Sequence, residues 1–399
     1  MVWSDIGSKP TEYVSHGKTS LTEALTGKIT LTHSEELKRG ITIRLGYADI
    51  TIYRCEKNHF ITTQKCPIDF TDAQPIRTVS IIDAPGHETL MATVLTGASL
   101  MDGAILVISA NEKCPQPQTK EHLIALEVVG IKNVIIVQNK IDLVSEERAM
   151  QSYNEIKNFV KGTILENAPI IPVSAIQRIN IDSLLEAIDN FIPTPKRDLT
   201  KDPRMLVARS FDVNRPGTEI EKLKGGILGG SIVRGKLKIG DTIEIKPGIR
   251  ISSKNKSLST KVTGLQKAGK DLEEAGPGGL LGVMTTLDPY LTKSDSLTGN
   301  LVGLPSKLPQ SVESLALEIK LLQRVVGSEE LKSVLPIKIN EDLLINSGTA
   351  RSIGSVTSIK KERTEMKLKI PICVEPGNRI VISRLIAGRW RLIGYGNAI

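Results

Sequence analysis

The sequence predicts an α/β domain with a doubly wound, mostly parallel sheet, followed by two β-barrel domains. Up to about Pro195, strand-like runs such as TVSII, GAILVIS and VIIVQN alternate with helical stretches such as KEHLIALEVVG and IDSLLEAIDNFI. This alternation is typical of a doubly wound sheet. After the linker PTPKRDLTKDP, short alternating strands separated by Gly, Pro and Asp turns replace it, which indicates β-barrels.

Two similar hairpin segments, GDTIEI and GNRIVI, lie one in each half of the β region. They favour two similarly built barrels, although segments this short can also converge through turn chemistry alone. The break between the barrels is expected near Pro309, within LPSKLPQS. We therefore predict three domains, which cover residues 1–199, 200–309 and 310–399.

Composition excludes several classes of protein. No stretch of the 399 residues approaches the roughly 20 apolar residues of a membrane span, so no membrane partner is predicted. The start MVWSDIGSK lacks a basic region followed by an apolar stretch, and four scattered cysteines do not form a disulfide framework. The expected compartment is reducing, and we predict the cytoplasm.

Charge differs between the two halves of the chain. Residues 1–199 contain 20 Lys and Arg against 24 Asp and Glu, a net −4, whereas residues 200–399 contain 32 against 20, a net +12. A basic surface of this size attracts a polyanion, and the alternative is a generally solubilising surface. Because aromatic residues make up only 3% of the chain, shape and phosphate recognition of a folded RNA fits better than base stacking.

The segment HGKTS at residues 16–20 predicts a phosphate-binding loop between a strand and a helix. Gly17 suits the tight turn, where backbone N–H groups and the helix dipole bind phosphate. Lys18 is expected to reach the outer phosphates, and the hydroxyl of Thr19 to coordinate Mg²⁺. The nucleotide contacts predicted from this segment are Ser15, His16, Gly17, Lys18, Thr19 and Ser20.

Two further motifs, RGITI and DAPGH, predict the parts that sense the terminal phosphate. Asp83 ends a buried strand, so its carboxylate is expected to face Mg²⁺. The backbone N–H of Gly86 is expected to contact the terminal phosphate of GTP and to lose that contact after hydrolysis, and Thr42 is expected to do the same. His87 is the one catalytic candidate, as the group that orients the attacking water, and the alternative is an exposed loop histidine.

The motif NKID predicts selection of guanine. The acceptors of Asn139 and Asp142 suit the N–H groups of guanine, and the Asp142 carboxylate rejects adenine because adenine offers no matching donors. Lys140 is expected to lay its stem along the base. The backbone expected to face the guanine oxygen belongs to Ser174, Ala175 and Ile176. In this order, the motifs predict a P-loop GTPase domain that binds GTP and GDP with Mg²⁺.

The chain resembles a known family over nearly its whole length. A switch domain with RGITI and DAPGH followed by two β-barrels resembles the translational GTPases of the elongation factor Tu group. Longer segments resemble the gamma subunit of eukaryotic and archaeal translation initiation factor 2, among them HSEELKRGITIRLGYADI, GTILENAPIIPVSA, RSFDVNRPGTEI and RWRLIGYG. An elongation-type or selenocysteine-specific tRNA carrier is the rival, and PQPQTKEHL and FIPTPKRD favour the initiation subunit.

The resemblance implies a function and partners. Members of this family bind initiator methionyl-tRNA in the GTP state and deliver it to the small ribosomal subunit. They form a heterotrimer with alpha and beta subunits. The motifs offer no obvious arginine finger, so GTP hydrolysis is expected to be slow without an activating factor, and exchange factors are further expected partners. The acceptor end of the tRNA lies between the GTPase domain and the second domain, where Tyr47 is a candidate contact. A plain sheet residue is the alternative for Tyr47.

The N-terminus departs from the family pattern GHVDHGKTS, since the chain reads PTEYVSHGKTS. Glu12 replaces a small residue, Ser15 replaces Asp, and the apolar first strand is absent, so a gap is expected in the centre of the sheet. Either the N-terminus is misassigned or truncated, or the chain binds nucleotide poorly. We favour the first, because the other motifs are intact. A degenerate, nucleotide-free scaffold is the rival function that Glu12 and the missing strand support.

Two metal positions also depart from the family. In some members the Asp at position 15 and a carbonyl near the first switch hold a further cation. Ser15 lacks that charge, although Gly40 could offer its carbonyl, so a single Mg²⁺ is expected at Thr19 and Thr42. Many members carry a four-cysteine zinc knuckle, of which only Cys55 and Cys66 remain here.

Zinc could still be surrounded by Cys55, His59, Cys66 and Asp69. The CxxxH and CxxD spacings are unusual for zinc. We therefore expect this insert to keep its fold without the metal.

Overall fold

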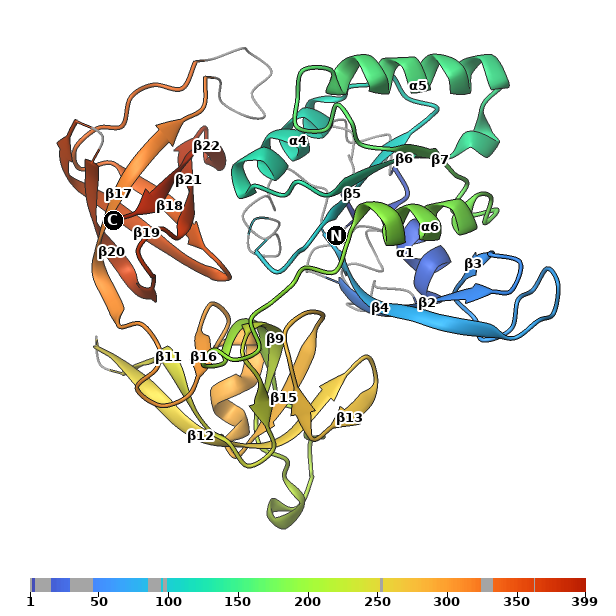
Figure 1. Cartoon of the computed structure of the whole chain (residues 1–399). Helices are drawn as coiled ribbons and strands as arrows, with labels where there is room; N and C mark the ends of the chain where they lie inside the picture. The colour runs from blue at the N-terminus through green and yellow to red at the C-terminus, as the bar shows by residue number, and fades with distance from the viewer. Residues whose placement is uncertain are drawn as a thin grey trace. The chain divides into compact units, whose positions relative to one another are not determined.

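The computed structural model describes residues 2–3, 16–28, 46–84, 95, 99–251, 254–323, 333–361 and 363–399. The chain forms two compact units, the first built from the chain up to Pro195 and the second from the chain that begins at Lys196 (Figure 1). Within the described part of the chain, no helix is both long enough and apolar enough to cross a bilayer.

One seven-stranded sheet organises the first unit. Its strands are β1 (Val2–Trp3), β2 (Gly46–Cys55), β3 (Phe60–Ile61), β4 (Ala73–Asp83), β5 (Ala104–Ser109), β6 (Val134–Asn139) and β7 (Ile170–Pro172), in the spatial order β3-β2-β4-β1-β5-β6-β7. Neighbours from β4 to β7 run parallel, whereas β2 pairs antiparallel with β3 and β4. Every residue of β5 and β6 is buried, which explains their continuous apolar runs.

Helices cover both faces of this sheet. They are α1 (Lys18–Thr26), α4 (Pro117–Val129), α5 (Glu146–Val160) and α6 (Ile181–Phe191), with a short 3₁₀ turn, η2, at Ile141–Leu143. Leu21 and Leu25 of α1 and Leu184 of α6 pack in one core with Val107 and Ile135 of the central strands. Figure 1 shows α4 and α5 on the opposite side of these strands. The predicted doubly wound, mostly parallel sheet is therefore confirmed.

The expected gap in the centre of the sheet is wrong. Val2–Trp3 form the two-residue strand β1 between β4 and β5, and both neighbours run parallel to it. Val2 lies opposite Asp83 on one side and Ile105 on the other. A search for a long apolar run misses a strand of two residues. Such a short strand can still form, because its two neighbouring strands supply hydrogen bonds from both sides.

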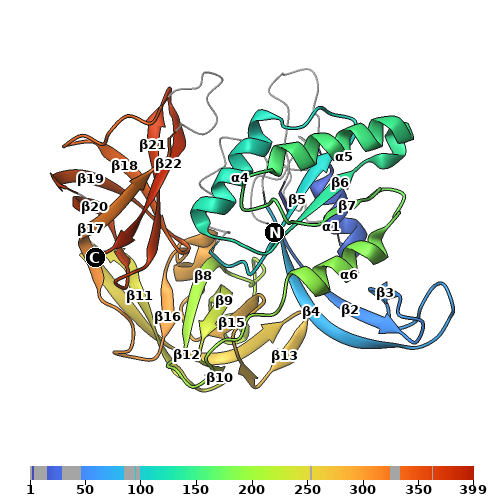
Figure 2. The same cartoon turned by 45° about the horizontal axis from the view of Figure 1, so that its top comes forward.

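The second unit begins with a closed barrel, seen from a second side in Figure 2. Its strands are β8 (Arg204–Phe211), β9 (Ile227–Arg234), β11 (Thr242–Ile251), β12 (Lys254–Lys267), β15 (Leu281–Thr285) and β16 (Leu301–Gly303), and pairing of β11 with β12 closes the ring. The smaller elements are β10 (Leu237–Lys238), β13 (Lys270–Leu272), β14 (Glu274–Ala275), η3 (Ile220–Lys222) and η4 (Pro289–Asp295). Buried Met205, Leu228 and Val283 contribute to its core.

A second closed barrel follows, in the order β17-β20-β19-β18-β21-β22. Its strands are β17 (Ser311–Leu321), β18 (Asp342–Ser347), β19 (Ala350–Lys360), β20 (Arg363–Cys373), β21 (Arg379–Ile386) and β22 (Arg389–Ala398). The predicted fold class, an α/β GTPase-type domain followed by two barrels, is confirmed. The predicted boundary near Pro309 falls between β16 and β17, and the three-domain division stays a prediction because both barrels belong to one compact unit.

The two similar hairpin segments do the same structural task. Each enters its strand after a glycine with positive φ, Gly240 at 91° and Gly377 at 82°, a conformation that side chains with a Cβ rarely adopt. Each strand then sends alternate isoleucines into its barrel core, and all four are fully buried, namely Ile243, Ile245, Ile380 and Ile382. Turn chemistry and period-2 patterning together explain why the two sequences look alike.

Arg77 of β4 holds the C-terminal end of α6 against the sheet. Its guanidinium donates hydrogen bonds to the carbonyl oxygens of Ile188 at 2.6 Å and Ile192 at 2.8 Å, and its Nε lies 2.9 Å from a carboxylate oxygen of Asp189. A cation is favourable at this end of a helix because the helix dipole is negative there.

Arg77→Ala is therefore expected to destabilise the first unit by about 2 kcal/mol, which lowers the melting temperature by about 4–8 °C. The control is Arg54→Ala, which removes an exposed arginine from the neighbouring strand and is expected to shift melting by less than about 2 °C. Thermal unfolding of both variants measures this, and equal shifts would contradict the role given to Arg77.

Candidate nucleotide-binding site

The predicted motifs meet at one edge of the parallel sheet. Asp83, Ser109 and Asn139 are the last residues of β4, β5 and β6, and the carboxyl ends of parallel strands are where such sheets bind ligands. Helix α1 begins at Lys18, directly after Gly17. Its first turn therefore lies beside the ends of these strands.

Gly17 is required at the start of α1 for two reasons. Its backbone is left-handed, with φ 83°, which disfavours residues that carry a Cβ. A Cβ at this position would also lie 2.4 Å from Nδ2 of Asn139. Lys18 follows as the first residue of the helix and is only 5% exposed, and the helix N-terminus is where phosphates are stabilised.

Thr19 and Asp83 meet as the motifs predict. The hydroxyl of Thr19 donates a hydrogen bond to Oδ2 of Asp83 at 3.0 Å, and Asp83 is fully buried. Hard oxygen ligands of this kind suit Mg²⁺. These two residues therefore fit a magnesium ion at the N-terminus of α1, where the ion would add positive charge beside bound phosphates.

Asn139 has a bracing role that the sequence does not predict. Its Nδ2 donates to the carbonyl oxygen of His16 at 2.8 Å, and its Oδ1 accepts from the backbone N–H of Ala175 at 3.1 Å. The side chain is buried, and it uses both ends of its amide within the protein. It therefore ties the phosphate loop to the segment predicted to face the base.

The other residues predicted to contact the base lie just beyond β6 and β7. Asp142 is exposed within η2, and Lys140 adopts a left-handed backbone with φ 63° directly after β6. Ser174 is fully buried, and its hydroxyl accepts from the backbone N–H of Gln177 at 3.1 Å. Ile176 is 73% exposed. The structure thus brings these residues to the same edge as the phosphate loop.

Several predicted positions need separate mention. Ser20 lies in the first turn of α1, and Tyr47 lies half-buried on β2, paired with Ile82 of β4. The roles assigned to Ser15, Gly40, Thr42, Gly86 and His87, and the concern about Glu12, fall outside the described residues and stay predictions.

Two groups beside the phosphate loop escaped the sequence analysis. Glu112, three residues beyond the end of β5, has a carboxylate oxygen 3.1 Å from Nε2 of His16. His122 of α4 is buried, and its burial together with the positive charges of Lys18 and His16 holds the pKa of its imidazole well below the ordinary value. His122 is therefore neutral at pH 7. For Glu112, the only signal in the sequence was its position just beyond the buried strand that ends at Ser109.

A candidate metal cluster lies away from this edge, where β2 and β3 meet the loop that follows. The side chains of Cys55, His59, Cys66 and Asp69 bring one ligand atom each to within 4.8 Å of one another. Nδ1 of His59 lies 3.5 Å from each sulfur and 3.7 Å from Oδ2 of Asp69. The four groups are therefore close enough together to surround one cation, and Cys, His and Asp are residues that bind zinc.

The same cluster can also exist without metal. Cys55 Sγ lies 3.6 Å from Oδ2 of Asp69, where a thiol can donate to the carboxylate. Burial raises the pKa of the Cys66 thiol, and hydrogen bonds from Thr71 and then Cys66 hold the pKa of Asp69 below its ordinary range. The chain lacks two of the four cysteines of the zinc knuckle found in many family members, but this alone does not exclude zinc. The expectation of a metal-free insert stays a prediction.

Comparisons with known proteins agree with this arrangement. Residues 13–194 match the elongation factor Tu GTP binding domain, and residues 313–398 match the C-terminal domain of initiation factor eIF2 gamma. The translation initiation factor 2 subunit gamma of Pyrococcus horikoshii is 59% identical over 389 residues, which cover 96% of this chain and 95% of that protein. The chain belongs to this gamma-subunit family. The subunit of the same description from Methanocaldococcus jannaschii has the same identity and coverage.

Membership in the gamma-subunit family places the chain among the translational GTPases. Solved structures agree on the fold: a bacterial selenocysteine-specific elongation factor has a TM-score of 0.74 at 25% identity, and this chain spans 57% of that protein's length. Elongation factor SelB of Methanococcus maripaludis, in complex with the GTP analogue GppNHp, has a TM-score of 0.69 at 21% identity. The gamma subunits are far more similar in sequence, which disfavours the rival assignment to a selenocysteine carrier.

The cluster geometry predicts, against the expectation from the sequence, that reduced, metal-free protein takes up one Zn²⁺ per chain when titrated with the ion. Cys66→Ser is expected to abolish tight uptake, because it removes one of only two thiolates. Cys373→Ser, which changes a buried cysteine in the second barrel, is the control and should behave as wild type. Competition with a chromogenic zinc indicator measures both, and absence of uptake by wild type would support the metal-free insert.

Proposed function

We propose that this chain is the GTP-binding gamma subunit of a translation initiation factor. In its GTP state it binds initiator methionyl-tRNA, delivers it to the small ribosomal subunit in the cytoplasm, and releases it after GTP hydrolysis. It acts together with alpha and beta subunits and under the control of exchange and GTPase-activating factors. The observation that carries the proposal is the contact of Thr19 with buried Asp83 beside the N-terminus of α1, within a chain of this family.

The described residues divide the work of nucleotide binding. Lys18 and the N-terminal backbone of α1 attract the phosphates, while Thr19 and Asp83 would hold Mg²⁺. When bound, Mg²⁺ neutralises charge on the outer phosphates. On the other side, Asp142 lies exposed beyond β6, where its carboxylate can accept from the base.

The switch itself depends on predicted residues outside the described ranges. Thr42 and Gly86 would be ordered by the terminal phosphate and released after hydrolysis. His87 would orient the attacking water, and no arginine is assigned to the transition state, so hydrolysis is expected to be slow without an activator. Tyr47 remains our candidate for contact with the aminoacylated acceptor end.

Replacement of Asp142 by Asn tests base selection and tRNA delivery together. The variant should bind GTP on the order of 100-fold more weakly, because a carboxylate that accepts two guanine donors is lost. It should accept xanthosine triphosphate, whose extra carbonyl complements the amide.

The measurement is filter retention of initiator methionyl-tRNA by the complex with alpha and beta subunits. Wild type should retain the tRNA with GTP alone, and the variant with the xanthine nucleotide alone. Asp72→Asn makes the same change at another exposed residue and should match wild type. Retention independent of the nucleotide, or no GDP binding by wild type, would favour a nucleotide-free scaffold.

His87→Ala tests the catalytic assignment. Stimulated GTP hydrolysis should fall by about 100-fold or more, the usual contribution of a group that positions or activates a nucleophile, while affinity for GDP stays within about twofold. Single-turnover hydrolysis with small ribosomal subunits and an activating protein gives the rate, and fluorescent GDP gives the affinity. An unchanged stimulated rate would reject the role of His87.

A further inference from the structure

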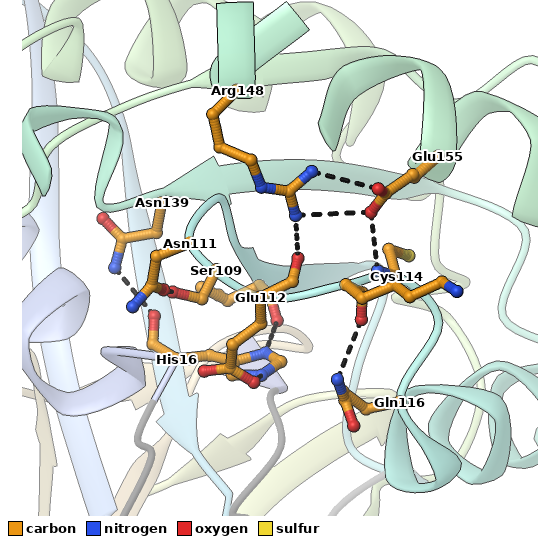
Figure 3. Close-up of polar contacts among 11 residues, drawn as sticks. His16, Ser109, Asn111, Glu112, Cys114, Gln116, Asn139, Arg148 and Glu155 are labelled. Atoms are coloured by element: carbon orange, nitrogen blue, oxygen red, sulfur yellow. Dashed lines mark hydrogen bonds and ion pairs between the residues drawn. The ribbon is translucent and has the colours of Figure 1, made fainter. Parts of the chain in front are cut away.

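Each ring nitrogen of His16, the first residue of the HGKTS segment, contacts an oxygen atom of the protein (Figure 3). Nδ1 lies 3.1 Å from the carbonyl oxygen of Val107, and Nε2 lies 3.1 Å from Oε2 of Glu112. A carbonyl only accepts, and an ionised carboxylate only accepts. When Glu112 is ionised, both ring nitrogens must therefore donate, and His16, which is 1% exposed, forms a partly buried ion pair with it.

The backbone of His16 is fixed as firmly as its ring. Its carbonyl oxygen accepts from Nδ2 of Asn139 at 2.8 Å, and the next residue is Gly17, the N-cap of α1. Because one short segment carries both the ring and the phosphate-binding turn, displacement of the ring moves the turn. The position of Glu112 is therefore linked to the position of the phosphate loop.

Glu112 is itself held by a turn and by helix α5. Its N–H donates to the carbonyl oxygen of Ser109, the last residue of β5, at 3.3 Å, and its carbonyl oxygen accepts from the guanidinium of Arg148. Arg148 also binds Glu155 at 3.0 Å, and Glu155 accepts from the N–H of Cys114 at 2.9 Å. Figure 3 shows this continuous arrangement from α5 to His16.

Fold stability alone is a weak explanation of the ion pair. Removing two charges from water is unfavourable, and buried ion pairs often contribute little compared with apolar residues of the same shape. Oε1 of Glu112 is buried and has no hydrogen-bond partner among the residues that the structure describes, so the carboxylate is not fully satisfied there. The other carboxylate oxygen, Oε2, contacts His16, and this contact points to a role in holding the phosphate loop.

We infer that Glu112 is a positioning residue for bound guanine nucleotides, which holds the phosphate loop in place through His16. The inference rests on the proposed nucleotide function and adds a residue to it. Glu112 touches neither phosphate nor base in this assignment. Its loss lets His16 and the turn at Gly17 move, and the backbone N–H groups of that turn then bind phosphates less well.

The test compares the release of fluorescent GDP from the full-length chain and its Glu112 variants. Glu112→Ala is expected to release GDP on the order of tenfold faster, and Glu112→Gln by a smaller factor because it keeps an acceptor but loses the charge. The matched control is Glu186→Gln on the exposed side of α6, which should stay within about twofold of wild type. GDP and GTP should be affected alike, since both share the phosphate loop.

A double-mutant cycle separates positioning from general loosening of the fold. In a His16→Gln background, Glu112→Ala should add less than about twofold to the release rate, because the contact through which it acts is already gone. If thermal unfolding shows that Glu112→Ala does not fold, Glu112→Gln replaces it in the same double-mutant cycle.

The outcomes distinguish the inference from the proposed function. If wild type binds GDP and neither Glu112 variant changes its release, the inference is wrong and the proposed function stands. If the effects of the His16 and Glu112 changes multiply, Glu112 acts by another route and the inference is also wrong. If wild type binds no guanine nucleotide, both fail together.

Discussion

The side-chain amide of Asn139 joins the two sides of the nucleotide site. It donates to the carbonyl oxygen of His16 and accepts from the N–H of Ala175, so phosphate-binding and base-binding segments share one rigid brace. The brace leaves no space for a Cβ at position 17. Glycine there is thus required by a contact with a distant residue as well as by its own backbone angle.

Buried charge is organised around the same brace. Lys18, His16, Asp83 and His122 are all nearly inaccessible to water, which is unfavourable for ionised groups unless partners or neutralisation compensate. Thr19 donates to Asp83, Glu112 pairs with His16, and His122 loses its charge through its lowered pKa. Lys18 and the helix N-terminus contribute positive charge at the loop, which suits a polyanionic ligand.

Local sequence patterns predicted most of the fold. Continuous apolar runs indicated the fully buried strands β5 and β6. The apolar face of α6 follows a period of 3.6 residues, and the alternating isoleucines of β11 and β21 follow a period of 2. The two-residue strand β1 lies below the length at which such a period can be recognised, so its presence was missed. The metal cluster was likewise recognised as four residue types, while their convergence depends on the register of β2 with β3.

The sequence by itself determined the motif order, the chemical class of ligand and the family, because each motif is local and its residue types suit phosphate, Mg²⁺ or guanine. Only the tertiary structure decided that Asn139 braces His16 across 123 positions, and that Glu112 reaches His16 across 96. Both contacts depend on the strand order and parallel register of β5 and β6. Strand order is a property of the packed sheet, which no local periodicity encodes.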